Sequence, residues 1–316
     1  MKTPEQMVRL LPKLLSLAVR AGAEILAVYE SDDFETERKA DDSPLTLADR
    51  RSHDVLDAGL RALAPEIPIL SEEGRSIPYD ERKHWDELWL VDPLDGTKEF
   101  IKRNGEFTVN IALVRHGEPV LGVIYAPDRH EAWVGVARSG RPADSDSDSG
   151  SPGFGAWKLA GAALDPFAGA EPHRSESAPG RAPLPQIPEM GRPISVRARD
   201  ERRVSIIASR THLNPETEAF IDRASDGFKD VDIVNVGSSL KLCYVAEGRA
   251  DLYPRYAPTS EWDTAAGHAI VRAAGGEIYQ AEPDAEGSGN DRKRTDRPLR
   301  YNKENVLNPW FVVRAW

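Results

Sequence analysis

The sequence predicts an α/β protein whose first half is α+β and whose second half alternates strands with helices. Three β-rich runs at 107–114, 119–126 and 132–136 follow one another, which indicates an antiparallel meander. His116-Gly117 between the first two runs is a hairpin signal. From 195 to 276 strand-like and helical runs alternate, as is typical of an α/β unit.

The composition describes a globular chain with an excess of acidic residues. Its 316 residues are 40% hydrophobic, and the formal net charge is −11. This balance disfavours a nucleic-acid backbone as partner, and it would repel an anionic substrate unless bound cations reversed the local field. Cys243 is the single cysteine, so an internal disulfide framework and a thiolate metal cluster are excluded. No apolar run approaches the roughly 18 residues of a membrane span, and we predict a cytoplasmic location.

Two helices are expected before the first strand. Residues 3–30 carry apolar side chains at three- and four-residue steps, and Pro12 suggests that the regular part begins there. Thr46 opens a second helix, with Asp49 placed as in a capping arrangement. Asp49 therefore has two interpretations: an acid that caps the helix, or a proton acceptor near a metal site.

The segment VDPLDGTKEF at 91–100 is the most informative part of the chain. It follows an apolar run at 88–91 that predicts a short buried strand, and the segment from Asp92 to Gly96 is expected to turn the chain. Such a turn would bring the carboxylates of Asp92 and Asp95 together, beside free N–H groups at Gly96 and Thr97 that could receive an anion. The alternative is an ordinary surface turn. Glu72-Glu73, after the apolar pair at 69–70, would then be solvated loop charges.

The composition divides the chain into three parts. We expect an N-terminal α+β half at 1–138 and a C-terminal α/β half at 194–316. The stretch at 139–193 is rich in Pro, Gly and Ser, and we interpret it as an extended, mobile insertion or linker. Apart from a short strand or turn at 156–163, it should contribute no core element.

The C-terminal half should contain several short elements. Asn214-Pro215 is a strong helix start, and Gly248 should close another helix. A further helix opens near Asp263, which stands where an N-cap belongs, and its small residues at 265–267 permit close approach of another backbone. Strands are expected at 195–197, 204–208, 231–236, 250–253 and 308–313.

Three short motifs in this order resemble the inositol monophosphatase superfamily of metal-dependent, lithium-sensitive phosphatases. They are SEE at 71–73, DPLDGT at 92–97 and WDTAAG at 262–267, and KADDSPLTLAD at 39–49 adds to them. The resemblance covers nearly the whole chain except 139–193. Within the superfamily, GTKEFIKRNGEFTVNIALV and the closing KENVLNPWF look like the 3′(2′),5′-bisphosphate nucleotidase branch. The resemblance implies a layered αβαβα sandwich of the inositol monophosphatase / fructose-bisphosphatase type. It also implies an enzyme that hydrolyses adenosine 3′,5′-bisphosphate to AMP and phosphate.

The resemblance also implies a magnesium site built from oxygen donors. Glu72, Asp92 and the carbonyl of Leu94 would bind one Mg²⁺, and Asp92, Asp95 and Asp263 would bind a second, within a site that holds two or three ions. Oxygen ligands without Cys or His suit a hard cation. The four carboxylates would exclude a phosphate dianion unless such cations reversed the local charge.

Further residues receive roles from the same resemblance. Gly96 and Thr97 would hold the scissile phosphate, and Asp49 with Thr97 would orient and deprotonate the attacking water. Three side chains match positions that contact the nucleotide and its second phosphate: Ser238, Lys241 and Arg255. The alternative is that Lys241 is a solvated helix charge and Arg255 a loop charge.

Two rival functions remain at this point. The first keeps the chemistry and takes inositol monophosphate or another small sugar phosphate as substrate, although Tyr256 stands where inositol-specific enzymes place an acid. The second is a catalytically silent relative that serves as a binding protein, which the four retained carboxylates disfavour. We expect a small phosphorylated nucleotide as ligand and a monomer or homodimer. The resemblance leaves peripheral association with the inner face of a membrane open.

Overall fold

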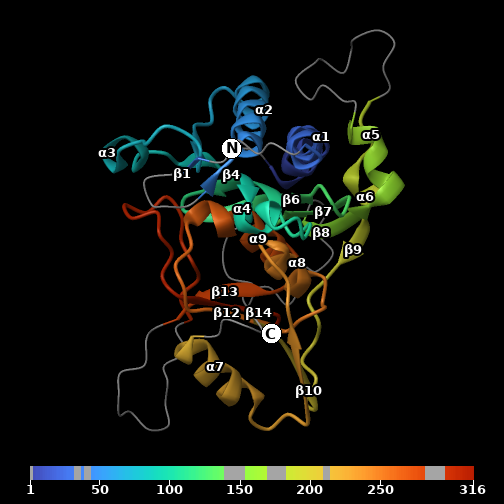
Figure 1. Cartoon of the computed structure of the whole chain (residues 1–316), viewed down its shortest axis with the longest axis vertical. Helices are drawn as coiled ribbons and strands as arrows, with labels where there is room; N and C mark the ends of the chain where they lie inside the picture. The colour runs from blue at the N-terminus through green and yellow to red at the C-terminus, as the bar shows by residue number, and fades with distance from the viewer. Residues whose placement is uncertain are drawn as a thin grey trace.

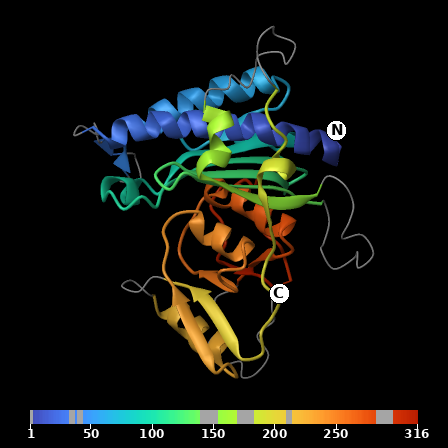
Figure 2. The same ribbon diagram turned by 90° about the vertical axis from the view of Figure 1, so that its right-hand side faces the viewer.

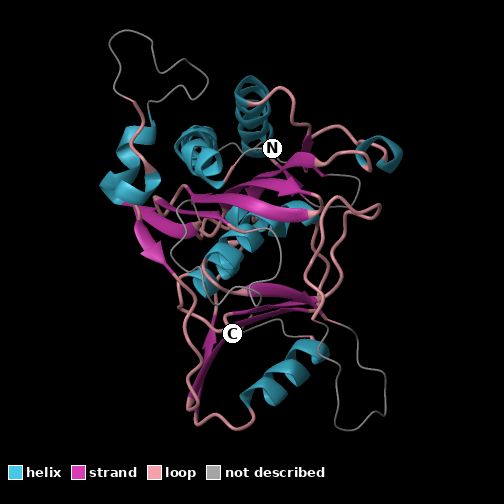
Figure 3. Ribbon diagram, turned by 180° about the vertical axis from the view of Figure 1, so that it is seen from behind, coloured by secondary structure: helices cyan, strands magenta, loops and turns pink. Residues whose placement is uncertain are grey.

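Helices and sheets alternate in layers along the long axis of the molecule (Figures 1 and 3). The computed structural model describes residues 3–31, 37–38, 44–138, 154–168, 183–208, 214–281 and 296–316. Two long helices lie on a seven-stranded sheet, two further helices lie beneath that sheet, and a five-stranded sheet and one more helix follow. The predicted αβαβα sandwich is confirmed.

The outer helical layer consists of α1 (Pro4–Tyr29) and α2 (Leu47–Leu63), which pack against each other. The helix α1 begins before Pro12 and continues through it, so the expectation that the regular part starts at Pro12 is wrong. A capping box between Thr3 and Gln6 holds the first turn, and buried Met7 and Leu11 anchor it to the core. These contacts outweigh the one hydrogen bond that proline removes.

The larger sheet is the predicted meander, extended at both ends. Only β3 and β4 are parallel, and all later neighbours are antiparallel. The hairpin turn at His116-Gly117 is confirmed by positive φ angles of 49° and 74°. The strands, in their order across the sheet, are β3 (Ile69–Ser71), β4 (Glu87–Asp95), β5 (Thr108–Arg115), β6 (Glu118–Ala126), β7 (Glu131–Val136), β8 (Gly155–Ala160) and β9 (Arg192–Ile194).

The stretch expected as an insertion at 139–193 contributes core elements in its described residues, which corrects that expectation. The strand β8 pairs along its whole length with β7, and β9 forms the far edge of the sheet. The short helices η2 (Gly161–Leu164), α5 (Asp165–Ala168) and α6 (Ile187–Met190) follow. Phe167 and Ile187 are fully buried, and the carbonyl of Phe167 accepts a 3.0 Å hydrogen bond from Ser16 Oγ of α1. Residues 139–153 and 169–182 lie outside the described part of the chain.

The inner helical layer consists of α8 (Leu240–Ala246) and α9 (Glu261–Ala273), which lie side by side between the two sheets (Figure 2). The predicted close approach at 265–267 is confirmed: a Cβ built on Gly122 of β6 would lie 2.2 Å from the carbonyl oxygen of Ala266. A Cβ on Gly267 would lie 2.4 Å from Leu242 of α8. Glycines therefore set how closely α9 packs on the sheet and on its neighbouring helix.

The smaller sheet has the strand order β11-β10-β12-β14-β13, and α7 (Pro215–Ser225) covers its outer face. Asn214 caps α7 as predicted. The final strand lies between β12 and β13, and β13 follows Gly275-Gly276 in a stretch where no strand was expected. The strands are β10 (Arg203–Ile207), β11 (Asp230–Val234), β12 (Leu252–Arg255), β13 (Glu277–Gln280) and β14 (Phe311–Arg314).

Three hydrophobic clusters fill the spaces between the layers. The first joins α1 and α2 to the larger sheet, the second joins the other face of that sheet to α8, α9 and the smaller sheet, and the third lies under α7. The remaining elements are short: β1 (Glu37–Arg38), β2 (Pro44–Leu45), α3 (Tyr79–Arg82) and α4 (Thr97–Ile101). No helix in the described ranges has the length and apolar character that crossing a bilayer requires.

Candidate metal centre and active site

A β-bulge places Asp92 and Asp95 on one face of the larger sheet. Asp92 pairs with Asn110 and Asp95 with Thr108, so β4 spans one residue more than β5 between the two pairs. In a regular strand, side chains three residues apart point to opposite faces, and the extra residue cancels this alternation. The strand thus runs on to Asp95 where the sequence suggested a turn, and the chain turns at Gly96, whose φ is 93°.

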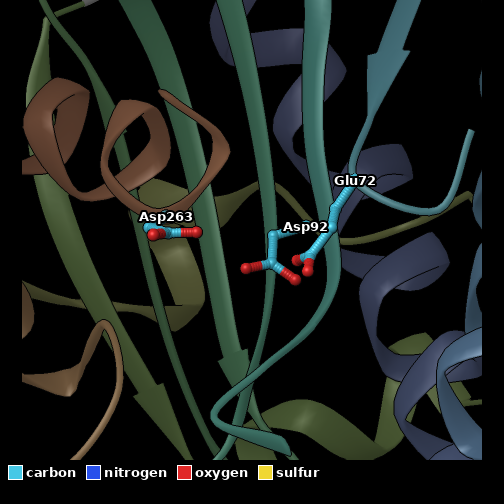
Figure 4. A group of neighbouring side chains, drawn as sticks. All are labelled: Glu72, Asp92 and Asp263. Carbon is cyan, nitrogen blue, oxygen red and sulfur yellow. The ribbon is translucent and has the colours of Figure 1, made fainter. Parts of the chain in front are cut away.

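Glu72, Asp92 and Asp263 come from three different elements and point toward one another (Figure 4). Glu72 follows β3, Asp92 lies on β4, and Asp263 lies in the first turn of α9. One oxygen from each side chain lies within 4.8 Å of the others. The sequence predicted that these three residues meet, and the structure brings them together.

The carboxylates of this cluster repel one another in a buried place. Burial, followed by the charges of Glu72, Asp95 and Asp263, raises the pKa of Asp92 well above its ordinary value. Burial and the charge of Asp95 raise the pKa of Asp263 to about 8. Negative charge is therefore held here at a cost, and a cation would relieve it.

The donor set fits a hard divalent cation. Every candidate ligand is a carboxylate or backbone oxygen, and the cluster contains neither Cys nor His within the described residues. Asp95 joins the cluster electrostatically, and its Oδ2 also accepts a 2.5 Å hydrogen bond from Ser239 N. Leu94 is buried beside it, at the bulge.

The first turn of α9 fixes the orientation of Asp263. Ser260 is the N-cap, and Asp263 is the third helical residue, so the expectation that Asp263 itself caps the helix is wrong. Asp263 Oδ2 accepts a 2.8 Å hydrogen bond from Ser260 N, which completes a capping box. One oxygen is thus tied to the helix end, and the carboxylate is held toward Asp92.

Asp49 is an acid of the capping box of α2, and its second oxygen also approaches Thr97. Its Oδ2 accepts hydrogen bonds from Thr46 N at 2.8 Å and Thr46 Oγ1 at 2.5 Å, as an acid of the capping box does. Its Oδ1 lies 3.5 Å from Thr97 Oγ1, across the layer boundary between α2 and α4. The capping box keeps Asp49 in place, and the second carboxylate oxygen of Asp49 faces Thr97.

Gly96 lies at a tight turn that leaves little room for a side chain. Its φ of 93° lies in the left-handed region, and a Cβ there would lie 3.0 Å from Glu106 O and 3.1 Å from Ser238 Cβ. The turn therefore brings the chain close to the loop before α8, and Thr97 begins the short helix α4 directly after it.

The three residues matched to nucleotide contacts line one pocket with the carboxylates. This pocket of about 80 Å³ is bordered by Asp95, Asp263, Ser238, Lys241 and Arg255, among others. Lys241 Nζ donates to Ser238 O at 3.2 Å, and Arg255 Nη2 donates to Pro258 O at 3.1 Å. Arg255 Nε is buried and finds no hydrogen-bond partner in the described part of the chain.

Thr108, Asn110 and Ser239, to which the sequence assigned no role, form a buried hydrogen-bonded network that reaches the pocket at Ser239. Asn110 Nδ2 donates to Ser239 Oγ at 2.9 Å, and Thr108 Oγ1 donates to Asn110 Oδ1 at 3.0 Å. Ser239 Oγ in turn donates to the carbonyl of Asp263 at 2.9 Å. A polar pair two residues apart in the apolar strand β5 was the available signal, because such side chains share one face.

Known proteins share this arrangement over nearly the whole chain. Residues 9–308 match the model of the Inositol monophosphatase family. The chain is 39% identical to the 3′(2′),5′-bisphosphate nucleotidase CysQ of Escherichia coli K12, over 97% of this chain and 100% of that protein, and 40% identical to CysQ of Salmonella typhimurium LT2 with the same coverage. The crystal structure of CysQ from Bacteroides thetaiotaomicron, "a bacterial member of the inositol monophosphatase family", is 45% identical, covers 96% of each chain and superposes with a TM-score of 0.72. The chain belongs to the inositol monophosphatase family and groups within it with the bisphosphate nucleotidases.

Proposed function

We propose that this protein is a Mg²⁺-dependent phosphatase that hydrolyses the 3′-phosphate of adenosine 3′,5′-bisphosphate to AMP and phosphate. The observation that carries the proposal is the convergence of Glu72, Asp92 and Asp263 beside a pocket lined by Lys241 and Arg255. The bisphosphate nucleotidase relatives, aligned along their full length, support the choice of substrate.

Glu72, Asp92 and the carbonyl of Leu94 would hold one ion, and Asp92, Asp95 and Asp263 a second, in a site for two or three. Bound Mg²⁺ would lower the pKa of a water molecule and neutralise the phosphoryl oxygens. The chain supplies the geometry: the bulge aims Asp92 and Asp95, and the capping box of α9 aims Asp263.

Thr97 and Asp49 would orient the attacking water and accept its proton. The Thr97 hydroxyl donates toward Asp49 Oδ1, so its lone pairs remain for a hydrogen bond from water. Attack forms a new P–O bond, the bond between phosphorus and the 3′-oxygen breaks, and a proton ends on that oxygen. Gly96 and Thr97 would hold the phosphoryl group through backbone N–H groups at the turn before α4, as the family resemblance implies.

Arg255 and Lys241 would bind the remaining phosphate, and Ser238 the nucleotide. The buried Arg255 Nε, which has no hydrogen-bond partner among the described residues, is a donor that a phosphate oxygen would satisfy. The pocket also brings Lys241 within reach of Asp95 and Asp263, so an anion there sits beside the proposed reaction centre. These cations give a second phosphate a reason to bind in an acidic chain.

Inositol monophosphate is the second candidate substrate. Solved inositol monophosphatases share the fold, such as that of Thermotoga maritima at 21% identity and a TM-score of 0.58. Tyr256, however, packs its ring against Phe220 at 5.9 Å and Trp310 at 5.4 Å between centroids, and it offers no carboxylate for sugar hydroxyls. We also propose a monomeric or homodimeric assembly and a cytoplasmic location.

Phosphate release tests the proposed substrate. The protein should release phosphate from adenosine 3′,5′-bisphosphate at least ~10-fold faster, by kcat/KM, than from inositol 1-phosphate with Mg²⁺ present, because only the nucleotide satisfies both cations. Li⁺ should inhibit the reaction. Preference for inositol 1-phosphate would overturn the roles of Ser238, Lys241 and Arg255, and no release from either substrate by folded protein would favour the silent relative.

A further inference from the structure

The turn at 237–239, between β11 and α8, contacts the site on several sides. Ser239 N donates to Asp95 Oδ2 at 2.5 Å, and Ser239 Oγ donates to Asp263 O at 2.9 Å. Ser238 Oγ lies 3.0 Å from Thr108 Oγ1, and its backbone has a φ of 47°. A serine in the left-handed region is uncommon and costs free energy, so the surrounding contacts must impose this conformation.

Glu106 holds this turn through its side-chain carboxylate. Its Oε2 accepts a 2.6 Å hydrogen bond from Gly237 N, and its Oε1 accepts a 2.8 Å hydrogen bond from Arg129 Nη2. A Cβ on Gly237 would lie 2.9 Å from Glu106 Oε2, so the contact is closely packed. The carboxylate therefore links the turn to the loop between β6 and β7 that carries Arg129.

Arg129 completes the link by contacting α8 itself. Its Nη1 donates to Tyr244 Oη at 3.0 Å. Tyr244 lies less than one helical turn after Lys241 on α8. The side chains of Arg129 and Glu106 are 26% and 25% exposed, so the ion pair is partly screened from solvent and keeps a defined geometry. Glu106 and Arg129 thus fix both the turn and the helix that present Ser238 and Lys241.

We infer that Glu106 and Arg129 are positioning residues that set the affinity for the nucleotide. This inference rests on the proposed function. Lys241 Nζ donates to Ser238 O, so the proposed nucleotide contacts move together when the turn moves. Ser239 keeps its own bonds to Asp95 and Asp263 when Glu106 is altered, so the proposed metal centre stays in place. The effect should therefore fall on KM, with kcat nearly unchanged.

The pairing of donors and acceptors provides a discriminating set of variants. Glu106 faces two donors, Gly237 N and Arg129. A glutamine has one oxygen and one NH₂ group, so Glu106→Gln leaves one N–H facing another N–H. With Arg129→Met in addition, the amide oxygen is free to turn to Gly237 N and restore the turn. If the double variant binds the nucleotide more tightly than Glu106→Gln alone, accumulated destabilisation cannot explain the effect of Glu106→Gln.

The experiment measures kcat and KM for adenosine 3′,5′-bisphosphate with Mg²⁺, together with AMP affinity by calorimetry, in the two single variants and the double variant. Glu106→Gln should raise KM and weaken AMP binding about 10-fold with kcat within about 2-fold, and the double variant should recover to within about 3-fold of wild type. Glu87→Gln is the matched control: Glu87 is 23% exposed, close to the 25% of Glu106, and pairs with Arg115 away from the turn.

Three outcomes would overturn the inference: an unchanged KM in Glu106→Gln, a fall in kcat without a change in KM, or a double variant worse than Glu106→Gln. The first two would show that the turn does not set nucleotide affinity, and the third that the pair is merely structural. Absence of phosphate release by the wild type would reject the proposed nucleotidase itself, and this inference with it.

Discussion

Single residues decide whether the acidic cluster is a site or a set of surface charges. The one additional residue in β4 turns Asp95 to the same face as Asp92, and the capping box of α9 ties one oxygen of Asp263 to Ser260 N. Ordinary features of strands and helix ends thus hold mutually repelling groups close together. Folding energy from the rest of the molecule maintains a charge arrangement that a cation would stabilise.

The pH dependence of stability tests this repulsion in metal-free protein. The pKa of Asp263 is about 8 in the folded state and about 3.9 when unfolded, so between these values the folded state binds more protons. The free energy of unfolding should therefore fall as pH rises from about 4 to about 8. Urea unfolding with EDTA should show a flatter profile for Asp263→Asn, whereas Asp80→Asn, on an 89% exposed side chain, should keep the wild-type slope. Equal slopes in all three proteins would contradict the account.

A methyl group at Gly96 tests the tight turn. Gly96→Ala should destabilise the protein by about 1–2 kcal/mol for its positive φ, with a further loss because the Cβ presses on Glu106 O and Ser238. Activity should fall as well, because the turn proposed to bind the phosphate shifts. Gly227→Ala is the control: its φ is also positive, at 84°, but nothing lies within 4 Å of the added atom. Gly227→Ala should lose only the stability that its positive φ costs and should keep full activity. Equal losses of activity in Gly96→Ala and Gly227→Ala would refute the steric argument.

At the scale of elements, α9 connects the layers. It packs on β5, β6 and β7 of the larger sheet, on α8 and on β13 of the smaller sheet, and it carries Asp263. Gly122 and Gly135 pair across β6 and β7 and both face this helix. The depth to which α9 settles on the sheet sets the distance between Asp263 and Asp92.

Two glycine variants should therefore give graded effects. Gly122→Ala places a Cβ 2.2 Å from the backbone oxygen of Ala266, whereas Gly135→Ala meets Ala273 Cβ and Ile270 Cα at 3.0 Å. We expect Gly122→Ala to cost about 1–3 kcal/mol of unfolding free energy, more than Gly135→Ala, because its added Cβ lies much closer to its nearest neighbour. Displacement of α9 should also alter the Mg²⁺ dependence of the rate: Mg²⁺ should bind more weakly, so that half-maximal activity requires more of it. Equal costs in urea unfolding, with unaltered Mg²⁺ dependence, would argue against α9 as the element that sets the site.

At the scale of the whole molecule, the sequence could predict what local signals specify. Periodic apolar residues predicted α1 and α2, hairpin residues predicted the meander, and motif order predicted the meeting of Glu72, Asp92 and Asp263. The sequence predicted β8 only as a short strand or turn at 156–163, and it missed β9, because these two strands are short and gain their place only by pairing with β7 and with each other. The bulge in β4 and the Glu106–Arg129 link depend on distant pairing partners, which a one-dimensional pattern does not contain.

The layered fold gathers the proposed ligands from β3, β4 and α9, elements that are far apart in the sequence. A metal bound there should favour the folded molecule by mass action, as well as supply its chemistry. The division into halves at 1–138 and 194–316 stays a prediction, since β8 and β9 extend the first sheet to the border of the second part.

The most direct test of the central claim is Mg²⁺-dependent phosphate release from adenosine 3′,5′-bisphosphate by the wild type and Asp92→Asn, with Asp80→Asn as control. We predict activity that saturates with Mg²⁺ and disappears with EDTA, a loss of at least ~10³-fold in Asp92→Asn, and full activity in Asp80→Asn. Folded Asp92→Asn that retained wild-type activity, or wild type that worked equally well in EDTA, would contradict the assignment of this cluster as the catalytic metal centre.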